Sequence, residues 1–343
     1  MSSDVVRVPL YGIFGDNFIR QVAVEAGNYR EVPTTRGTFI EVDRNSLLNV
    51  LKVASSRAKN MVKVIPMNGN DQKTYGNVLK VLGFNQADPA WKVLDSYVPE
   101  DNHFTRGDFT PISFLKPDLY EYARLPGRLG NAHTRKIINV PPGYVILAVA
   151  GWVLSRLGSA QVSDREWVGV HAFSNVRSAL QTLIDHLITK RIPGIKPETA
   201  LSLWLAIKAI EANVSVDNLI LEIYVVSDAF GKKPTELKGG FSVDLSRLLS
   251  RKELLTPNGS TYLEQLASMA LSINCGQTCE RDFAIRFTNL VYEYVNGSRR
   301  LEDLLYLAYR EYIVNMKSSD FCKNNPARCY AYRYAEGLRR SSG

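Results

Sequence analysis

The most apolar run of the chain, YVILAVAGWVLSRL, extends from Tyr144 to Leu157 and places the strongest constraint on the fold. It is too short to cross a bilayer comfortably, because a spanning helix needs about 20 apolar residues. Arg156 also interrupts it. A helix that is hydrophobic on all sides is normally buried in a protein core. We therefore expect a buried helix here, and no membrane among the partners.

Composition indicates a folded chain with anionic partners. Hydrophobic residues make up 45% of the 343 residues, which is enough to build real cores. The 42 Lys and Arg residues exceed the 34 Asp and Glu residues and give a formal charge of +8. That excess favours nucleic acid as a partner and does not bear on the fold. The start, MSSDVVRVPLYG, carries no apolar signal core, so we expect a cytoplasmic protein.

Hydrophobic periodicity changes along the chain and predicts an α+β fold. In the N-terminal part, strand-like and helix-like patterns alternate. A strand is predicted at Thr38–Val42, followed by a helix that Asp43 caps. Asp16 is expected to cap an earlier helix that stops at Gly27. From Ser242 onward the patterns are helical only, which predicts a C-terminal helical bundle.

The segment RIPGIKP, from Arg191 to Pro197, is the clearest punctuation in the chain, because it combines two prolines with a glycine. It predicts two domains. The first, residues 1–195, is an α/β domain with a basic loop at residues 101–142. The second, residues 196–343, is mainly helical, with one strand near residues 218–226.

The basic loop, residues 101–142, is too rich in Pro and Gly for one long helix and is a candidate nucleic-acid site. Its last part, Tyr122–Pro142, has no acidic residue. Cations on such a segment neutralise phosphates, and aromatic side chains between them can stack bases. The alternative is a surface loop whose aromatic side chains enter the core. The candidate contacts are Arg106, Lys116, Arg124, Arg128, Asn131, His133, Arg135 and Lys136.

The C-terminal end is a second candidate contact with nucleic acid. Arg328 and Arg333 lie in a stretch that also contains three tyrosines and one acid, Glu336. The alternative is a solvated tail that contacts nothing.

All four cysteines lie in the C-terminal part of the chain, at Cys275, Cys279, Cys322 and Cys329. Four thiolates could hold zinc, but these spacings differ from the usual CxxC knuckles. Disulfides are rare in ordinary cytosol and accepted in hyperthermophiles. We favour disulfides or free thiols over zinc, and expect no cofactor.

The sequence contains no evident catalytic motif. Its four histidines form no HxH, HxxxH or HExxH pair, and a GxSxG elbow and a P-loop are also absent. The carboxylates show no spaced cluster of the kind found in two-metal nucleases, although such clusters can assemble from distant positions. We expect a protein that is not an enzyme. A metal-dependent nuclease with dispersed carboxylates is kept as an alternative.

An α/β region opening VRVPLYGIFGDNFIRQVAVEAG, a basic middle loop and a helical C-terminal bundle follow one another along the chain. In this order they resemble the large subunit of the archaeal type I-A CRISPR interference complex, Cascade (the Csa4 group). The resemblance implies a non-catalytic ribonucleoprotein subunit that contacts guide RNA, target DNA and other subunits of the complex.

The same resemblance implies that the subunit recognises the motif flanking the target and helps to recruit the helicase-nuclease. In RNA-guided systems the protein reads only the flanking motif, while guide pairing reads the rest. We expect residues 128–136 to meet target DNA beside the guide-paired region. A general nucleic-acid-binding or viral structural protein is the alternative of a different class.

Overall fold

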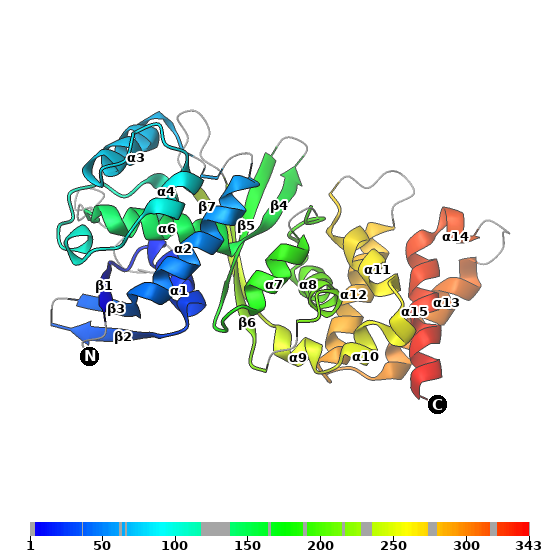
Figure 1. The fold of residues 1–343 in the computed structure, drawn as a ribbon. Coiled ribbons are helices and arrows are strands. Elements are labelled where there is room, and N and C mark those ends of the chain that lie inside the picture. Colours follow the sequence, from blue (N-terminus) through cyan, green and yellow to red (C-terminus); the bar gives the residue numbers. More distant parts are fainter. Residues whose placement is uncertain are drawn as a thin grey trace. The chain divides into compact units, whose positions relative to one another are not determined.

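The computed structural model describes residues 4–35, 37–61, 64–65, 67–117, 138–163, 166–187, 191–214, 217–227, 235–273, 280–315 and 321–342. Sheets occur in the N-terminal part and helices dominate the C-terminal part, which confirms the α+β class (Figure 1). The chain forms two compact units, each built from several segments. Unit 1 comprises Met1–Leu157, Gly169–Gln181 and Glu222–Gly240. Unit 2 comprises Gly158–Val168, Thr182–Leu221 and Phe241–Gly343.

The first sheet of unit 1 has three antiparallel strands in the order β1-β3-β2. The strands are β1 (Val5–Leu10), β2 (Tyr29–Thr34) and β3 (Gly37–Asp43). β3 confirms the strand predicted at Thr38–Val42. β2 was not predicted, because its sequence YREVPT combines charges with a proline and lies mostly exposed at the edge of the sheet.

Two helices cover one face of this sheet, α1 (Gly15–Ala26) and α2 (Arg44–Lys59). α2 begins as predicted, because the Asp43 carboxylate accepts a hydrogen bond from the Ser46 N–H at 2.8 Å. The prediction that Asp16 caps α1 is wrong. Asp16 lies inside the helix, and its carboxylate accepts hydrogen bonds from the backbone N–H groups of the preceding turn. Gly27 ends α1 as expected, with a φ of 85°.

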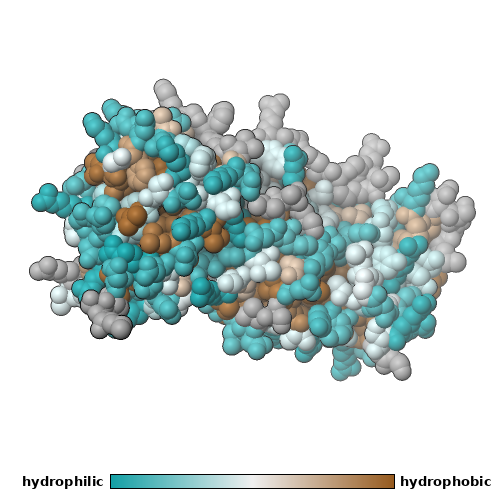
Figure 2. Space-filling view, viewed as in Figure 1, coloured by the Kyte–Doolittle hydropathy of each residue, from teal (hydrophilic) through white to brown (hydrophobic). Residues whose placement is uncertain are grey.

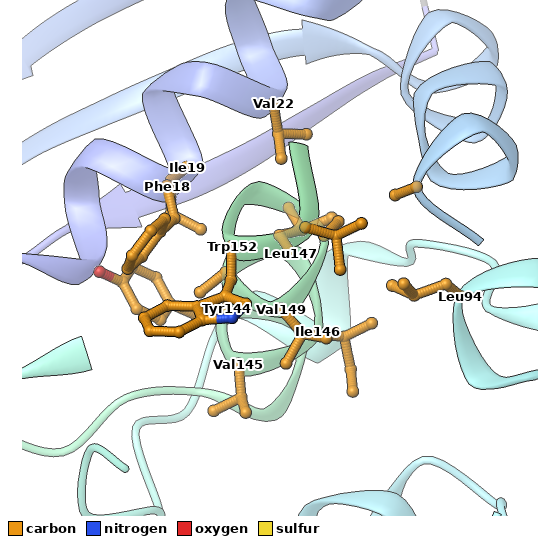
Figure 3. Close-up of a cluster of buried hydrophobic side chains, with 14 of the residues drawn as sticks. Phe18, Ile19, Val22, Leu94, Tyr144, Val145, Ile146, Leu147, Val149 and Trp152 are labelled. Carbon is orange, nitrogen blue, oxygen red and sulfur yellow. The ribbon is translucent and has the colours of Figure 1, made fainter. Parts of the chain in front are cut away.

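The apolar run forms α6 (Pro142–Ser155), and all 14 of its residues are buried. Phe18 of α1 packs on Trp152 of α6 with ring centroids 5.5 Å apart (Figure 3). At Gly151 the two helices touch through their backbones, since an added Cβ would lie 2.3 Å from the Phe18 carbonyl oxygen. The predicted buried helix is therefore confirmed. Leu157, the last residue of the run, already belongs to the next strand.

The second sheet has four strands in the order β4-β5-β6-β7. The strands are β4 (Arg156–Ser163), β5 (Glu166–Ser174), β6 (Ile220–Ser227) and β7 (Glu236–Asp244). β6 agrees with the strand predicted near residues 218–226. β4 and β7 were not predicted, and β7 corrects the expectation of helices alone from Ser242. Its sequence ELKGGFSVD has two adjacent glycines and a single β-branched residue, so its composition gives little strand signal.

Unit 1 also contains two further α-helices, α3 (Gly69–Val81) and α4 (Ala90–Ser96), and two 3-10 helices, η1 (Asp101–Phe104) and η2 (Ser113–Leu115). The remaining helices follow β5: α7 (Ala179–Leu187), α8 (Glu198–Glu211), α9 (Leu245–Leu249), α10 (Lys252–Leu255), η3 (Pro257–Gly259), α11 (Tyr262–Leu271), α12 (Arg281–Val295), α13 (Leu301–Asn315), α14 (Phe321–Asn324) and α15 (Pro326–Ser342). In unit 2, the apolar stripe of α12 faces α8, α11 and α15, as a bundle core should.

The helices that the structure describes include none that is both long and apolar enough to span a membrane. Figure 2 shows hydrophobic side chains in separate groups among hydrophilic ones on the visible face.

Candidate nucleic-acid interface

The described residues on both sides of positions 118–137 form the base of the predicted basic loop. Phe109 and Val140 pair in an isolated antiparallel bridge. The distance from the Phe109 nitrogen to the Val140 carbonyl oxygen is 3.2 Å, and that from the Val140 nitrogen to the Phe109 carbonyl oxygen is 2.8 Å. Gly107 permits this approach, because a Cβ there would lie 2.5 Å from the Asn139 carbonyl oxygen. The two arms of the loop are thus joined to each other by backbone hydrogen bonds.

The arm before residue 118 is also held by a carboxylate. Asp71, in the first turn of α3, accepts hydrogen bonds from the Ser113 N–H at 3.1 Å and from the Ser113 hydroxyl at 2.5 Å. The next two residues, Phe114 and Leu115, are completely buried. The base of the loop is therefore part of the core of unit 1.

The described aromatic side chains of the loop belong to this core. Phe104 is only 5% exposed and Phe114 is fully buried, with its ring centroid 5.1 Å from that of Trp152. Phe109 is partly buried against the same cluster. The alternative in which the aromatic side chains enter the core is therefore correct for Phe104 and Phe114, which are not available to stack bases, and Phe109 packs on the core with part of its surface.

The predicted contact residues of the loop fall into two groups. Arg106 is exposed at the base, one residue before the close approach at Gly107, and Lys116 is half-buried. The others lie outside the described residues: Arg124, Arg128, Asn131, His133, Arg135 and Lys136.

The two C-terminal candidates, Arg328 and Arg333, have different surroundings. The Arg328 guanidinium donates to Glu280 and, at 2.9 Å, to Glu311, and lies 5.1 Å from the Phe283 ring centroid. Its side chain is 26% exposed, and burial lowers the pKa of this guanidinium. Arg333 is exposed beside the ring of Tyr262. The charge of Arg328 therefore balances carboxylates inside unit 2, whereas Arg333 faces solvent.

Cys322 and Cys329 form a disulfide, with their Cα atoms 5.2 Å apart, and link α14 to α15. Cys275 and Cys279 lie outside the described residues. Within the described part of the chain, no three His, Cys, Asp or Glu side chains form a group that could hold a metal ion.

Sequence reasoning missed a buried serine–histidine pair in unit 1. Ser155 Oγ lies 2.9 Å from His171 Nδ1, and the Trp152 ring packs on the imidazole with centroids 4.1 Å apart. Burial holds the pKa of His171 well below its usual value, so the ring is neutral. Ser155 and His171 are both completely buried, so this pair serves packing and is closed to a substrate. No sequence motif joins the two residues.

Two buried carboxylates were also missed as structural centres. Glu25 accepts hydrogen bonds from the Gln21 amide at 3.0 Å, the Ser178 N–H at 3.0 Å and the Gln181 amide at 2.8 Å. Asp16 has a comparable set of donors. Desolvation raises the pKa of both carboxyl groups, while these hydrogen bonds act in the opposite direction. Both side chains bind segments of unit 1 to each other.

The comparison with protein-family models matches residues 40–312 of the chain to the family described as CRISPR-associated protein, CsaX. The matched range is more than half of the 343 residues and contains the complete basic loop. The comparison with curated proteins gives no match.

Proposed function

The chain belongs to the CsaX family of CRISPR-associated proteins, and from this premise we propose that it is a non-catalytic subunit of an RNA-guided interference complex. In this proposal it takes the place of the large subunit of a type I-A complex, in the cytoplasm. Its partners are guide RNA, target DNA, the other subunits and the helicase-nuclease that it helps to recruit. It recognises the motif that flanks the target.

The observation that carries the proposal is the fixed base of the basic loop. The acid-free segment Tyr122–Pro142 carries three arginines and one lysine, and the bridge between Phe109 and Val140 closes the base of the loop that contains it. Arg106 adds an exposed cation at that base. Contacts from Lys and Arg to phosphates position a protein on nucleic acid, and base contacts from neighbouring polar side chains add specificity.

The non-catalytic part of the proposal is supported by how the buried reactive groups are used. Ser155 and His171 bond to each other in the core, and the carboxylates of Asp16 and Glu25 each accept several internal hydrogen bonds. We expect the purified protein to leave RNA and DNA intact when Mg²⁺ or Mn²⁺ is added. Cleavage that depends on the metal and on this chain would contradict this part of the proposal.

The loop is tested by the salt dependence of nucleic-acid binding. Replacing Arg124, Arg128, Arg135 and Lys136 with alanine should weaken binding and flatten the slope of log K against log salt. The expected change is about 0.9 for each duplex phosphate that the protein no longer neutralises. A control that removes the same charge elsewhere uses four exposed lysines: Lys52, Lys73, Lys80 and Lys252. An unchanged slope in the loop variant would remove the loop from the interface.

Two single variants separate positioning from reading within an assembled complex. Arg135→Ala should weaken binding to every DNA about equally, since a phosphate contact carries no sequence information. Asn131→Ala should erode the preference for the correct flanking motif, because a good bidentate base contact discriminates by about 1–3 kcal/mol. The measurement compares two duplexes that differ only in that motif. Full retention of affinity and preference by both variants would show that the loop is not the reader.

Membership of a complex is tested by affinity purification from the native cell. We expect the tagged protein to carry short guide RNAs and other CRISPR-associated subunits, identified by sequencing and mass spectrometry. Recovery of the protein alone, or with unrelated nucleic acid, would favour a general nucleic-acid-binding protein.

A further inference from the structure

The β1-β3-β2 sheet has one face that is turned away from α1 and α2. Side chains alternate between the two faces of a strand. Val6, Val8, Ile40 and Val42 belong to the buried cluster that also contains residues of both helices. The intervening residues and their register partners must therefore lie on the opposite face. We call five of these the sheet-face cluster: Arg7, Arg30, Val32, Phe39 and Glu41.

Two arginines of this cluster share one carboxylate. Glu41 on the central strand accepts a hydrogen bond from Arg7 Nε at 2.9 Å and another from Arg30 Nε at 2.5 Å. The side chain of Glu41 is only 8% exposed, whereas those of Arg7 and Arg30 are 73% and 75% exposed. Two cations paired with one anion leave a net positive charge. The Glu41 carboxylate positions both guanidinium groups on this face of the sheet.

The second arginine is expected to add little to stability. One arginine is enough to pair Glu41, and ion pairs with exposed partners typically contribute only about 0–1 kcal/mol. Both bonds use Nε, and among the described residues the terminal guanidinium nitrogens of Arg7 and Arg30 have no hydrogen-bond partner. Guanidinium groups with unused donors are suited to phosphate oxygens.

An aromatic ring lies next to these cations. Phe39 is two residues from Glu41 on β3, on the same face, and pairs in register with Val32 of β2. Phe39 and Val32 are half-buried and are not among the side chains that pack on the core of unit 1. Their apolar surface is therefore partly open to solvent, in contrast to the buried aromatic side chains at the base of the loop.

The layout around this face is one that suits unpaired bases. The elements run β1-α1-β2-β3-α2, which is the order at the start of a split β-α-β fold, with both helices behind the sheet. Four-stranded sheets of this general kind bind single-stranded RNA by stacking bases on aromatic side chains of the open face. A ring can stack a base only where the base is unpaired, which favours single strands over duplex.

We propose that the sheet-face cluster binds single-stranded nucleic acid, with Arg7 and Arg30 on phosphates and Phe39 stacked on a base. The proposal rests on the proposed nucleic-acid function, but it uses residues distinct from the basic loop. The strand comes from one of two sources that share this chemistry, the guide RNA or the DNA strand displaced from the target.

The test measures binding of the full chain to labelled 12-nucleotide oligouridine RNA and oligothymidine DNA by fluorescence anisotropy at several salt concentrations. Arg7→Ala/Arg30→Ala should flatten the salt slope by about 1.4, from two single-strand phosphate contacts. Phe39→Leu keeps an apolar side chain and should weaken binding about fivefold or more, because leucine cannot stack on a base. Lys73→Ala/Lys80→Ala removes the same charge from exposed positions of α3 and should change neither quantity.

Each variant is made both in the natural sequence and in the loop variant that lacks Arg124, Arg128, Arg135 and Lys136. If the sheet-face variants have no effect on binding in either background, the sheet proposal is overturned. If the loop variant still weakens binding in that case, the proposed function stands. If neither set has an effect, both proposals fail. The stronger of the RNA and DNA responses identifies the source of the strand.

Cross-linking keeps the test decisive if a variant fails to fold. The unmodified protein is irradiated with 4-thiouridine RNA and with 4-thiothymidine DNA, and the cross-linked peptides are sequenced. Cross-links within β3, residues 37–43, would support the proposal. Cross-links confined to other segments would overturn it.

Discussion

Asp16 Oδ1 lies 2.7 Å from the hydroxyl of Tyr144, and this hydrogen bond joins the first turn of α1 to the first turn of α6. The same carboxylate accepts hydrogen bonds from the N–H groups of Tyr11, at 3.0 Å, and Gly12, at 2.6 Å. One buried side chain therefore fixes the β1–α1 turn to the central apolar helix. The turn therefore stabilises the packing of α1 on α6 in unit 1.

Tyr144→Phe should destabilise the protein by about 1–3 kcal/mol, because a buried acceptor loses one of its donors while the ring is kept. Denaturant unfolding measures this change. The matched control is Tyr75→Phe, since the hydroxyl of Tyr75 is buried without a hydrogen-bond partner among the described residues. The control should be neutral or slightly stabilising. Equal losses in the two variants would show that the bond to Asp16 contributes nothing.

Gly151→Ala should disrupt the contact between α1 and α6. The added methyl group would lie 2.3 Å from the Phe18 carbonyl oxygen, so the helices must separate, at a cost of about 1–3 kcal/mol or more. Gly69→Ala in α3 is the control, because a Cβ there meets nothing within 4 Å. That substitution should stabilise the helix slightly. Thermal unfolding of both variants decides the matter, and a Gly151→Ala melting temperature equal to the natural one would contradict the packing argument.

His171 predicts a loss of stability at mildly acidic pH. Its pKa is lowered in the folded state by burial, and an unfolded histidine titrates near 6.5. The stability that the neutral ring contributes is therefore complete above about pH 6.5 and declines as the pH falls, by at most about 1.4 kcal/mol per pH unit. His171→Gln cannot take up this proton. It should flatten the dependence of unfolding free energy on pH between about 6.5 and 5, whatever its effect at neutral pH.

His103 supplies the comparison for this pH series. Its pKa is also lowered, first by burial and then by Arg44, while Glu100 acts in the opposite direction. His103→Gln should therefore flatten the pH dependence in the same sense but less than His171→Gln. A dependence that survives the His171 variant unchanged would mean that other groups cause it.

How far the sequence predicted this fold depended on whether the signal was local. The run at Tyr144–Leu157 predicted α6 because its apolar character is continuous, and Asp43 predicted the start of α2 because capping uses the next turn of chain. Asp16 is also an aspartate near the start of a helix, but it lies in the first turn of α1 and does not cap it. It bonds instead to Tyr144, 128 residues away, which no local pattern encodes.

The disulfide Cys322–Cys329 should stabilise the end of the chain. In the chain-entropy model, a closed loop of this short length stabilises by about 2–3 kcal/mol. We expect a reductant to lower the melting temperature of a Cys275→Ser/Cys279→Ser background. The same reductant should have no effect once Cys322 and Cys329 are also replaced. Nucleic-acid affinity at low temperature should change little, and a large loss of affinity without destabilisation would contradict a structural role.

The candidate site was predictable only in part, for the same physical reason. The basic segment is visible as an unbroken run without acids, but whether an aromatic side chain is open or buried depends on contacts far along the chain. Phe114 is buried against Trp152 and Phe18, whereas Phe39 is partly open because its strand is covered by helices on the other face only. Alternation along β3 places Phe39 on the same face as Glu41, but only contacts far along the chain decide which face of the sheet the helices cover.

Arg328 and Arg333 should separate stability from binding, although they lie five positions apart on one helix. Arg328→Ala removes the shared partner of Glu280 and Glu311, leaving two carboxylates side by side in a partly buried site. It should lower the melting temperature clearly, because removing one partner of a buried pair leaves uncompensated charge. Arg333→Ala removes an exposed cation beside Tyr262 and should leave the melting temperature nearly unchanged.

If the C-terminal end contacts nucleic acid, Arg333→Ala should also flatten the salt slope by about 0.7–0.9, as expected for one phosphate contact. Thermal unfolding and salt titrations on both variants give the answer. A salt slope lowered by Arg328→Ala at temperatures where that variant is fully folded would return Arg328 to the interface, and an unchanged slope in Arg333→Ala would remove Arg333 from it.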